Sequence, residues 1–470
     1  MDISNVSTMP SIEVLVSQYM SIERQPVVQL EDDKKEINMV KNIFTDLKSK
    51  LTALRSAADD LKKTGTDSQF AAKMATSANE SVLTATAGGA ATSGSHMIKV
   101  NQLAKADTRV SGQINRNDTS LASTIGAGTK SFTVTINGEE TQIDLEINAD
   151  DDNATIMSNL AQAINDSGAE VSASVVNDSS TTARLSLRSE NTGSDYAISI
   201  ADDSGTLINS LGLDTSAKAT DTAGGYIYDP SELDAKFELD GISIVSDSNS
   251  VDDVLQGVTL NLTSVQEAGA DPVQLTIETD SDTVKSNLET FFKAYNDVLD
   301  YIKLKTSVDP ELEVRGELAG DFTFINLRMN LRTLVSSAVS SVTTGNPRLI
   351  SEVGIEPNSS GNLSIADSEK FSDALDLDSN RVADLFTSEN GIANQIYNIL
   401  TPFTKTGGII DDDKSALDSR IRNINSHISN LEARLAWKEE NYRNQFTKLQ
   451  EAYSAIATQQ SMLQSLSSYY

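Results

Sequence analysis

The sequence of 470 residues contains no cysteine and only two histidines. The absence of cysteine excludes disulfide bonds, thiolate catalysis and thiolate metal sites, so the fold must be stabilised by packing. Basic residues are in a clear minority, because 37 Lys and Arg stand against 68 Asp and Glu and give a formal net charge of -31. A surface this acidic repels nucleic acid and anionic membranes, and we expect neither as a partner.

Long apolar runs are also absent. No stretch of about 20 consecutive apolar residues occurs, so we expect no membrane insertion. The N-terminus begins Met-Asp-Ile and lacks the basic start, the apolar run and the cleavage site of a secretory signal peptide. The sequence therefore predicts a protein that is either cytoplasmic or exported without a cleaved signal.

Residues that carry chemistry are not grouped in any recognisable motif. His96 and His427 each lack a second ligand at metal spacing, and the acidic runs 150–152 and 411–413 lack the ligand pattern of a calcium loop. Residues 126–131 resemble a phosphate-binding loop but lead into a strand pattern instead of a helix. No Gly-x-Ser-x-Gly elbow occurs. We expect no catalytic residue, no metal and no cofactor, and hence no enzyme.

Both ends of the chain carry apolar residues at alternating steps of three and four, the spacing that places them along one side of a helix. The N-terminal ladder consists of Ile37, Val40, Phe44, Leu47, Leu51, Leu54, Ala58 and Leu61. The C-terminal ladder consists of Leu417, Ile421, Ile424, Ile428, Leu431 and Leu435, and after a slip at Tyr442 and Phe446 it resumes at Leu449, Tyr453, Ile456 and Leu463. Each ladder predicts a long helix.

Neither ladder can bury its apolar side alone. The ladders must pair with each other, with a second copy of the chain or with another protein, which favours a role in assembly. The core of an ordinary helical bundle would explain the same spacing. Their position at opposite ends of the chain favours a stalk or leg, in which the ladder residues form a helix-pairing or oligomer interface. Pro10 and Pro26 limit helix length before the first ladder.

The middle of the chain changes to the period of two that is typical of strands. Apolar and polar residues alternate on both sides of Asn137-Gly138 and again around Asp240-Gly241, and both patterns predict β-hairpins. A short helix is predicted from Asn153, as its N-cap, to Asn165. The segment 107–275 has 28 acidic and 7 basic residues, a net charge of -21, so most of the excess charge lies in this β-rich region.

These patterns predict an α+β multidomain fold, in which long, coiled-coil-like terminal helices are brought together and β-rich domains are inserted between them. The predicted parts are a flexible N-terminal arm (1–31), the N-terminal helical half of a leg (32–106), a first β-rich inserted domain (107–127 with 224–275), a second α+β inserted domain (128–223), a helical domain that pairs with 32–106 (276–408) and a C-terminal coiled-coil helix (409–470).

Several motifs are shared with one known family. An apolar helix over 12–20 is followed by a Glu-Arg-x-Pro element at 23–26, and an extended Ile-Lys-Val-Asn-Gln-Leu-Ala segment occupies 98–104. Farther along, 353–386 combines Val-Gly-Ile and Gly-Asn-Leu-Ser-Ile-Ala elements with a series of apolar positions. The chain resembles, over essentially its full length, the bacterial flagellar filament cap family, also called flagellar hook-associated protein 2. The usual Gly-Ser-Gly opening of that family is replaced here by Met9-Pro10-Ser11.

The resemblance implies a structural cap at the distal tip of the flagellar filament, which promotes folding and insertion of exported flagellin. It implies an extracellular protein, secreted by the flagellar type III pathway without a cleaved signal peptide. The implied partners are further copies of the chain in a ring of about four to six, flagellin, hook-filament junction proteins and an export chaperone at the C-terminal helix. The legs would be made from the terminal helices.

Two other functions fit parts of the pattern. A flagellin or a hook-filament junction protein also has helical ends around a β insert, but the tail at 459–470 does not resemble the flagellin C-terminus. A coiled-coil adhesin stalk with a β head belongs to a different class of protein. The adhesin predicts a parallel self-associated helix from one ladder, whereas the cap predicts that both ladders of one chain lie close together.

Overall fold

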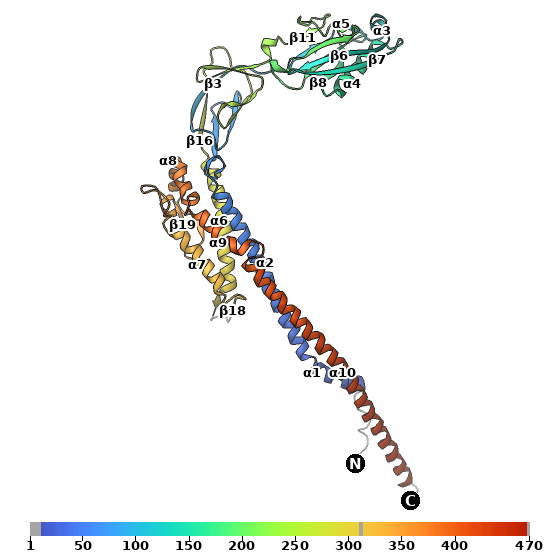
Figure 1. Cartoon of the computed structure of the whole chain (residues 1–470), viewed down its shortest axis with the longest axis vertical. Coiled ribbons are helices and arrows are strands. Elements are labelled where there is room, and N and C mark those ends of the chain that lie inside the picture. The colour runs from blue at the N-terminus through green and yellow to red at the C-terminus, as the bar shows by residue number, and fades with distance from the viewer. Residues whose placement is uncertain (1–10, 310–313, 468–470) are drawn as a thin grey trace. The chain divides into compact units, whose positions relative to one another are not determined.

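The computed structural model describes residues 11–309 and 314–467 (Figure 1). The chain divides into two compact units, of which one comprises residues 1–63 and 285–470 and the other comprises residues 64–284. The second unit is therefore an insertion in the sequence of the first. The predicted α+β fold with terminal helices brought together and β-rich domains between them is confirmed.

The first unit is mostly helical. Its helices are α1 (Ile12–Glu23), α2 (Gln25–Leu61), α6 (Ser281–Thr306), α7 (Phe322–Ser336), α8 (Ser368–Thr387), α9 (Ile392–Thr404) and α10 (Ile409–Ser467). Two short hairpins accompany them, β17 (Val308–Asp309) with β18 (Val314–Arg315) and β19 (Ile355–Pro357) with β20 (Leu363–Ile365). No helix among residues 11–309 and 314–467 has both the length and the apolar character needed to cross a membrane.

Helix α2 begins at Gln25, earlier in the chain than the predicted helical half of the leg, which started at residue 32. The Ser11 hydroxyl caps α1 by accepting a hydrogen bond from the Val14 amide, and Pro26 occupies the first turn of α2. Proline is tolerated there because the first amides of a helix have no partner within the helix. The prediction of a flexible arm over 1–31 is therefore wrong for residues 12–31, and its first ten residues lie outside the described part of the chain.

Aromatic side chains fill the core of the helical unit. The Phe291 ring lies 6.4 Å from Phe386 and 6.5 Å from Tyr295, all three being buried. The Tyr295 hydroxyl donates a hydrogen bond of 3.2 Å to the Leu331 carbonyl of α7. Burial raises the pKa of Tyr295 well above its ordinary value, which keeps this hydroxyl a neutral donor.

The second unit contains two β domains with separate cores. The first domain packs a five-stranded sheet of order β1-β16-β3-β12-β13 with a three-stranded sheet of order β14-β15-β2 around one apolar cluster. Its strands are β1 (Lys73–Ser77), β2 (Leu83–Ala87), β3 (Gly94–Gln102), β12 (Ala235–Leu239), β13 (Ile242–Ser246), β14 (Ser250–Leu255), β15 (Val258–Leu262) and β16 (Val273–Thr279).

The second domain is an α+β module inserted between β3 and β12. One sheet has the order β10-β6-β7, the other the order β11-β4-β9-β5 with β8 also paired to β9. The elements are β4 (Thr108–Val110), β5 (Ile114–Asn115), α3 (Ser120–Ile125), β6 (Gly128–Ile136), β7 (Glu139–Ile147), α4 (Asn153–Asp166), β8 (Val171–Val176), β9 (Thr182–Ser189), β10 (Ser199–Ser204), α5 (Leu207–Leu211) and β11 (Gly225–Tyr226).

Both predicted hairpins are confirmed. Asn137 and Asp240 adopt φ values of 47° and 53° in the turns between β6 and β7 and between β12 and β13. The predicted cap of α4 is wrong by one residue, because the Asp152 carboxylate accepts the hydrogen bond from the Thr155 amide. Asn153 is instead fully buried, and its side-chain amide ties α4 to the segment before α3.

Two predicted domain boundaries differ from the structure. Residues 73–102, predicted within the helical half of the leg, form β1, β2 and β3 of the first β domain, because they pair with β15 and β16 from the far side of the insertion. Residues 108–125, predicted in the first β domain, belong to the second, where β4 pairs with β9 and α3 packs into its core. Both boundaries depend on pairing between strands that are distant in sequence, and the local sequence pattern does not predict which strands pair.

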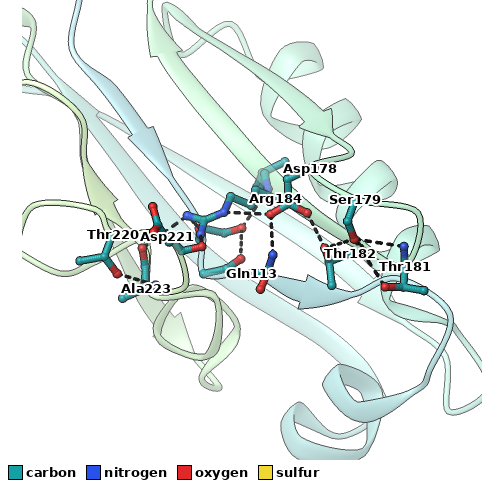
Figure 2. A network of polar contacts seen from close by, with 12 residues as sticks. Gln113, Asp178, Ser179, Thr181, Thr182, Arg184, Thr220, Asp221 and Ala223 are labelled. Carbon is teal, nitrogen blue, oxygen red and sulfur yellow. Dashed lines mark hydrogen bonds and ion pairs between the residues drawn. The ribbon is translucent and has the colours of Figure 1, made fainter.

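Arg184 organises the polar surface of the second β domain (Figure 2). Its guanidinium donates to the carbonyl oxygens of Ser111 and Asp221 and contacts the Asp178 carboxylate at 3.3 Å. Asp178 also accepts hydrogen bonds from Gln113 at 3.0 Å and from Thr182 at 2.5 Å, and the Thr182 bond is the main cause that lowers its pKa. Arg184 thus holds the long segment before β11 against the sheet.

Candidate functional site formed by the paired chain ends

The two chain ends meet along α10. Helices α1 and α2 from the N-terminus both pack on α10 from the C-terminus, and we call their shared surface the end-pairing interface (Figure 1). With 59 residues, α10 is about 90 Å long at a rise of 1.5 Å per residue. It starts at Ile409, directly after Gly408, which is also the first residue of the predicted C-terminal helix over 409–470.

The structure buries nearly the whole N-terminal ladder. Val40 is half-buried, and the other members are fully buried, namely Ile37, Phe44, Leu47, Leu51, Leu54, Ala58 and Leu61. Ile43 is also buried, although it lies outside the ladder. A second buried position beside the ladder shows that α2 packs on more than one neighbouring helix, and α9 and α10 both contact it.

The C-terminal ladder is buried less evenly. Leu435 is fully buried, and five ladder residues are half-buried, namely Leu417, Ile421, Ile424, Ile428 and Leu431. Beyond Phe446 the ladder becomes exposed: Leu449, Ile456 and Leu463 have exposed fractions of 46%, 53% and 66%. The distal third of α10 therefore presents apolar side chains that the described part of the chain leaves uncovered.

Ion pairs fix the register between α2 and the start of α10. The Lys48 ammonium lies 2.6 Å from the Asp411 carboxylate, and Lys41 pairs with Asp418 seven residues farther along. Lys414 donates a hydrogen bond of 2.9 Å to the Thr45 hydroxyl between them. The hydrogen bond from Lys48 is the main cause that lowers the pKa of Asp411. The partner on α10 moves from Asp411 to Asp418 as the partner on α2 moves back from Lys48 to Lys41, so the two helices run antiparallel.

Helix α1 extends this antiparallel packing towards the C-terminus. Val16, Met20 and Val27 form a small apolar cluster with Leu435 of α10. The Tyr19 ring lies 5.6 Å from Tyr442 and 5.7 Å from Phe446, between ring centroids. Tyr442 and Phe446, which interrupt the spacing of the C-terminal ladder, are therefore the aromatic residues of α10 that pack against α1.

The Glu23 carboxylate forms the polar contact between α1 and α10 beside this apolar cluster. The Glu23 carboxylate accepts hydrogen bonds from the Lys438 ammonium at 2.6 Å and from the Tyr442 hydroxyl at 3.1 Å. The Lys438 bond is the main cause that lowers the pKa of Glu23, and the bond to Glu23 raises the pKa of Tyr442. Glu23 belongs to the Glu-Arg-x-Pro element, but the sequence assigned it no role. Lys438 was not singled out from the sequence, because only the fold brings this residue opposite Glu23.

The opposite side of α2 packs on the helical domain. The Tyr301 hydroxyl of α6 contacts the Asp46 carboxylate at 3.3 Å, and the Lys62 ammonium lies 3.4 Å from the Tyr397 ring centroid of α9. The Phe44 ring lies 5.8 Å from Phe324 of α7. Through these contacts α2 connects the chain end on α10 to the compact helical core.

The described residues hold no group of three or more His, Asp or Glu side chains that could bind a metal ion. His96 contacts only one carboxylate, that of Asp240, at 2.8 Å. Asp411, Asp412 and Asp413 begin α10, where negative charge is stabilised by the helix dipole. The contacts at the end-pairing interface join helices to one another.

A helical unit built from both chain ends, with β domains inserted between its halves, defines a structural protein of the assembly type. Comparisons with known proteins give the particular family. The family profiles described as "Flagellar hook-associated protein 2 N-terminus" and "Flagellar hook-associated protein 2 C-terminus" match residues 10–107 and 233–458. This chain belongs to the flagellar hook-associated protein 2 family, the cap proteins of the flagellar filament.

Named relatives agree with this assignment. The chain is 31% identical over 427 residues to the B-type flagellar hook-associated protein 2 of Pseudomonas aeruginosa, covering 88% of this chain and 84% of the relative. It is 26% identical to the flagellar hook-associated protein 2 of Escherichia coli K12, covering 89% and 88%. The fold matches the crystal structure of the Escherichia coli flagellar cap protein FliD, domains D1-D2-D3, with a TM-score of 0.65, 26% identity and coverage of 80% and 99%. The flagellin, junction protein and adhesin alternatives are not favoured.

Proposed function

We propose that this chain caps the distal tip of the flagellar filament and that its end-pairing interface forms a movable leg of the cap. The main support is that the two ladders pack together and are joined by ion pairs between α2 and α10, whose partners are 377 and 363 residues apart in sequence. Such a leg makes and breaks no covalent bond. The arriving flagellin would supply the driving force by burying its own apolar surface as it folds beneath the cap.

The cap would consist of several copies of the chain, about four to six by family resemblance. The exposed apolar residues on the distal third of α10 suit a contact with other helices, because an uncovered apolar stripe on a helix marks a binding surface. These residues, Leu449, Tyr453, Ile456 and Leu463, would contact neighbouring copies, junction proteins or flagellin in the assembled filament. The same stripe would be covered by an export chaperone before secretion.

The proposed route to the tip is the flagellar type III pathway without cleavage of a signal peptide. The N-terminal segment supports this route because α1 is part of the packed interface, where Val16 and Met20 are buried. Removal of such a segment would expose the apolar side of α10. Mass spectrometry of the secreted protein tests this proposal, and an N-terminus trimmed past residue 12 would contradict it.

The leg is tested by placing charges inside it. In Leu47→Asp combined with Ile424→Asp, two carboxylates face the end-pairing interface without a partner, and we expect the leg to separate. Cells that carry this double variant are expected to release flagellin into the medium and to grow no filaments. The matched control combines Thr52→Asp with Asn423→Asp, both on exposed positions of the same helices. Normal filaments in the first variant would contradict the leg mechanism.

A further inference from the structure

Strand β13 is a bare edge of the first β domain. It ends the five-stranded sheet, and β12 is its only partner strand in the described part of the chain. Ile242 and Val245 on this strand have exposed fractions of 65% and 62%. Two such residues in a strand of five are unusual for a surface that faces only water.

The backbone of β13 offers free hydrogen-bonding groups as well as apolar side chains. Leu239 and Ile242 close the two-residue turn between β12 and β13, and the residues that close such a turn bond to each other. The direction of the amides alternates along the strand, so Ser243 and Val245 direct their N–H and C=O groups away from β12. An added strand would find these donors and acceptors in place.

Elsewhere in the same unit, side-chain amides cover strand backbone groups that no neighbouring strand pairs with. The Asn165 side chain accepts a hydrogen bond of 2.7 Å from the Ala173 amide of β8 and donates one of 2.9 Å to its carbonyl. Gln266 does the same for Val100 of β3, with its side-chain oxygen on the amide at 3.0 Å and its backbone amide on the carbonyl at 3.0 Å. These clamps occupy the groups that another strand would use.

Two other edge strands, β7 and β14, are protected by charge. Strand β7 carries Glu139, Glu140, Asp144 and Glu146, and β14 carries Asp252 and Asp253 together with an irregular register. Charged residues and irregular pairing are the usual means by which edge strands avoid other chains. The sequence of β13, Ile-Ser-Ile-Val-Ser, contains no charge and no proline. Edge strand β2 is also uncharged, but it presents no exposed large apolar side chain, whereas β13 combines an uncharged sequence with exposed Ile242 and Val245.

We propose that β13 is a docking strand for an extended segment of another protein, which pairs as a sixth strand and carries apolar residues between basic flanks. The basic flanks follow from charge, because Asp240 and Asp247 stand exposed at the two ends of β13. Charge also disfavours a second copy of this domain as the occupant, since the segment 107–275 has a net charge of -21. Strand addition supplies affinity through backbone bonds and specificity through alternate side chains.

A synthetic peptide tests the docking strand directly. Fluorescein-labelled KKVTVTVKK is titrated into the full-length chain, and binding is followed by fluorescence anisotropy. We expect saturable binding, and we expect Val245→Pro to weaken it by about tenfold, because proline removes an outward amide while leaving the bonds to β12 in place. Val245→Thr is the matched control, since it keeps both the strand and the amide, and its affinity should stay within about twofold of the wild type.

Three results would overturn the proposal. The first is equal binding of KKVTVTVKK to Val245→Pro and to the wild type, with the thermal melting of both chains compared to confirm folding. The second is equal affinity for EEVTVTVEE, which would show that β13 does not select a segment with basic flanks. The third is sedimentation of the wild type as an oligomer that Val245→Pro dissociates, which would assign β13 to a second copy. If Val245→Pro fails to fold, Val245→Lys replaces it, because the added charge repels the basic peptide and keeps the amide.

Discussion

The Lys438 ammonium lies 2.6 Å from the Glu23 carboxylate, although 415 positions of sequence separate the two residues. Tyr442, one helical turn after Lys438, donates to the same carboxylate. This contact holds the first helix of the chain on the last one. Because α1 buries only a few apolar side chains, the polar contact at Glu23 contributes to the register in which those side chains meet α10.

Acidification should release α1 from α10. The pKa of Glu23 is lowered in the folded chain, chiefly by the bond from Lys438, so the stabilisation is present above the ordinary value near 4.5 and is lost as the pH falls through the folded pKa. We expect amide hydrogen exchange in residues 12–23 to accelerate as the pH is lowered through this range, after correction for the intrinsic rate. Mass spectrometry of peptic fragments measures the change.

Glu23→Gln provides the control for this release. Glutamine keeps the size of the side chain but does not titrate, so its α1 should exchange faster at neutral pH and show little further change on acidification. Identical pH profiles for Glu23→Gln and the wild type would show that another group holds α1 in place.

The ladders could be read from the sequence, but their depth of burial could not. Leu51 and Leu449 are both ladder leucines, yet Leu51 is fully buried and Leu449 is 46% exposed. Spacing records which side of a helix is apolar, and it carries no information on how far the partner helix extends. For the same reason Glu23 and Lys438 could not be paired from sequence. The hairpins were predictable because turn chemistry and alternation lie within 20 residues.

Truncation of the two ladder leucines should separate the buried from the exposed part of the interface. We expect Leu51→Ala to lower the free energy of unfolding of the helical unit by about 2–5 kcal/mol, because it leaves a cavity among packed helices. Leu449→Ala should change it by about 0.5 kcal/mol or less in the isolated chain. Urea denaturation followed by helical circular dichroism compares the two variants, and a similar loss in both would show that α10 is covered along its full length.

Tyr301 should stay neutral in alkali where ordinary tyrosines ionise. Burial, together with the Asp46 carboxylate, raises the pKa of Tyr301 to about 12. The contact it makes with α2 is thus present below pH 10, the ordinary tyrosine value, and is lost as the pH rises through the folded pKa. Spectrophotometric titration of the wild type and of Tyr301→Phe isolates its contribution. The difference between the two curves should rise near pH 12, and a rise near pH 10 would contradict the burial of this hydroxyl.

Gly193 should tolerate no side chain, because Asp247 approaches it closely at the joint between the two β domains. Its φ is 104°, and a Cβ atom there would lie 2.3 Å from the Cβ atom of Asp247. Ser194, the next residue, anchors this joint through hydrogen bonds to the Asp234 carboxylate at 2.6 and 2.9 Å. We expect Gly193→Ala to loosen the joint and to increase protease cleavage around it.

Gly168→Ala is the matched control for this joint. Gly168 also has a positive φ, 75°, but a Cβ atom there would have no neighbour within 4 Å. Its substitution should cost only the backbone strain of about 1–2 kcal/mol and leave the joint intact. Equal proteolysis of Gly168→Ala and Gly193→Ala would show that strain alone, without the contact to Asp247, explains the effect.

Excision of the second β domain should succeed only at the boundaries that strand pairing defines. The Lys105 amide donates a hydrogen bond of 2.8 Å to the Leu233 carbonyl, so a short glycine-serine linker can replace residues 106–232. Deletion of 128–223 alone removes most of the core around α3 and exposes Leu121, Ala122 and Ile125 to solvent. We expect the first deletion to give a soluble protein that does not aggregate and keeps its full helical signal, and the second to aggregate. Circular dichroism and gel filtration distinguish them, and a soluble, well-folded product from the shorter deletion would contradict the assignment of residues 108–125 to the second domain.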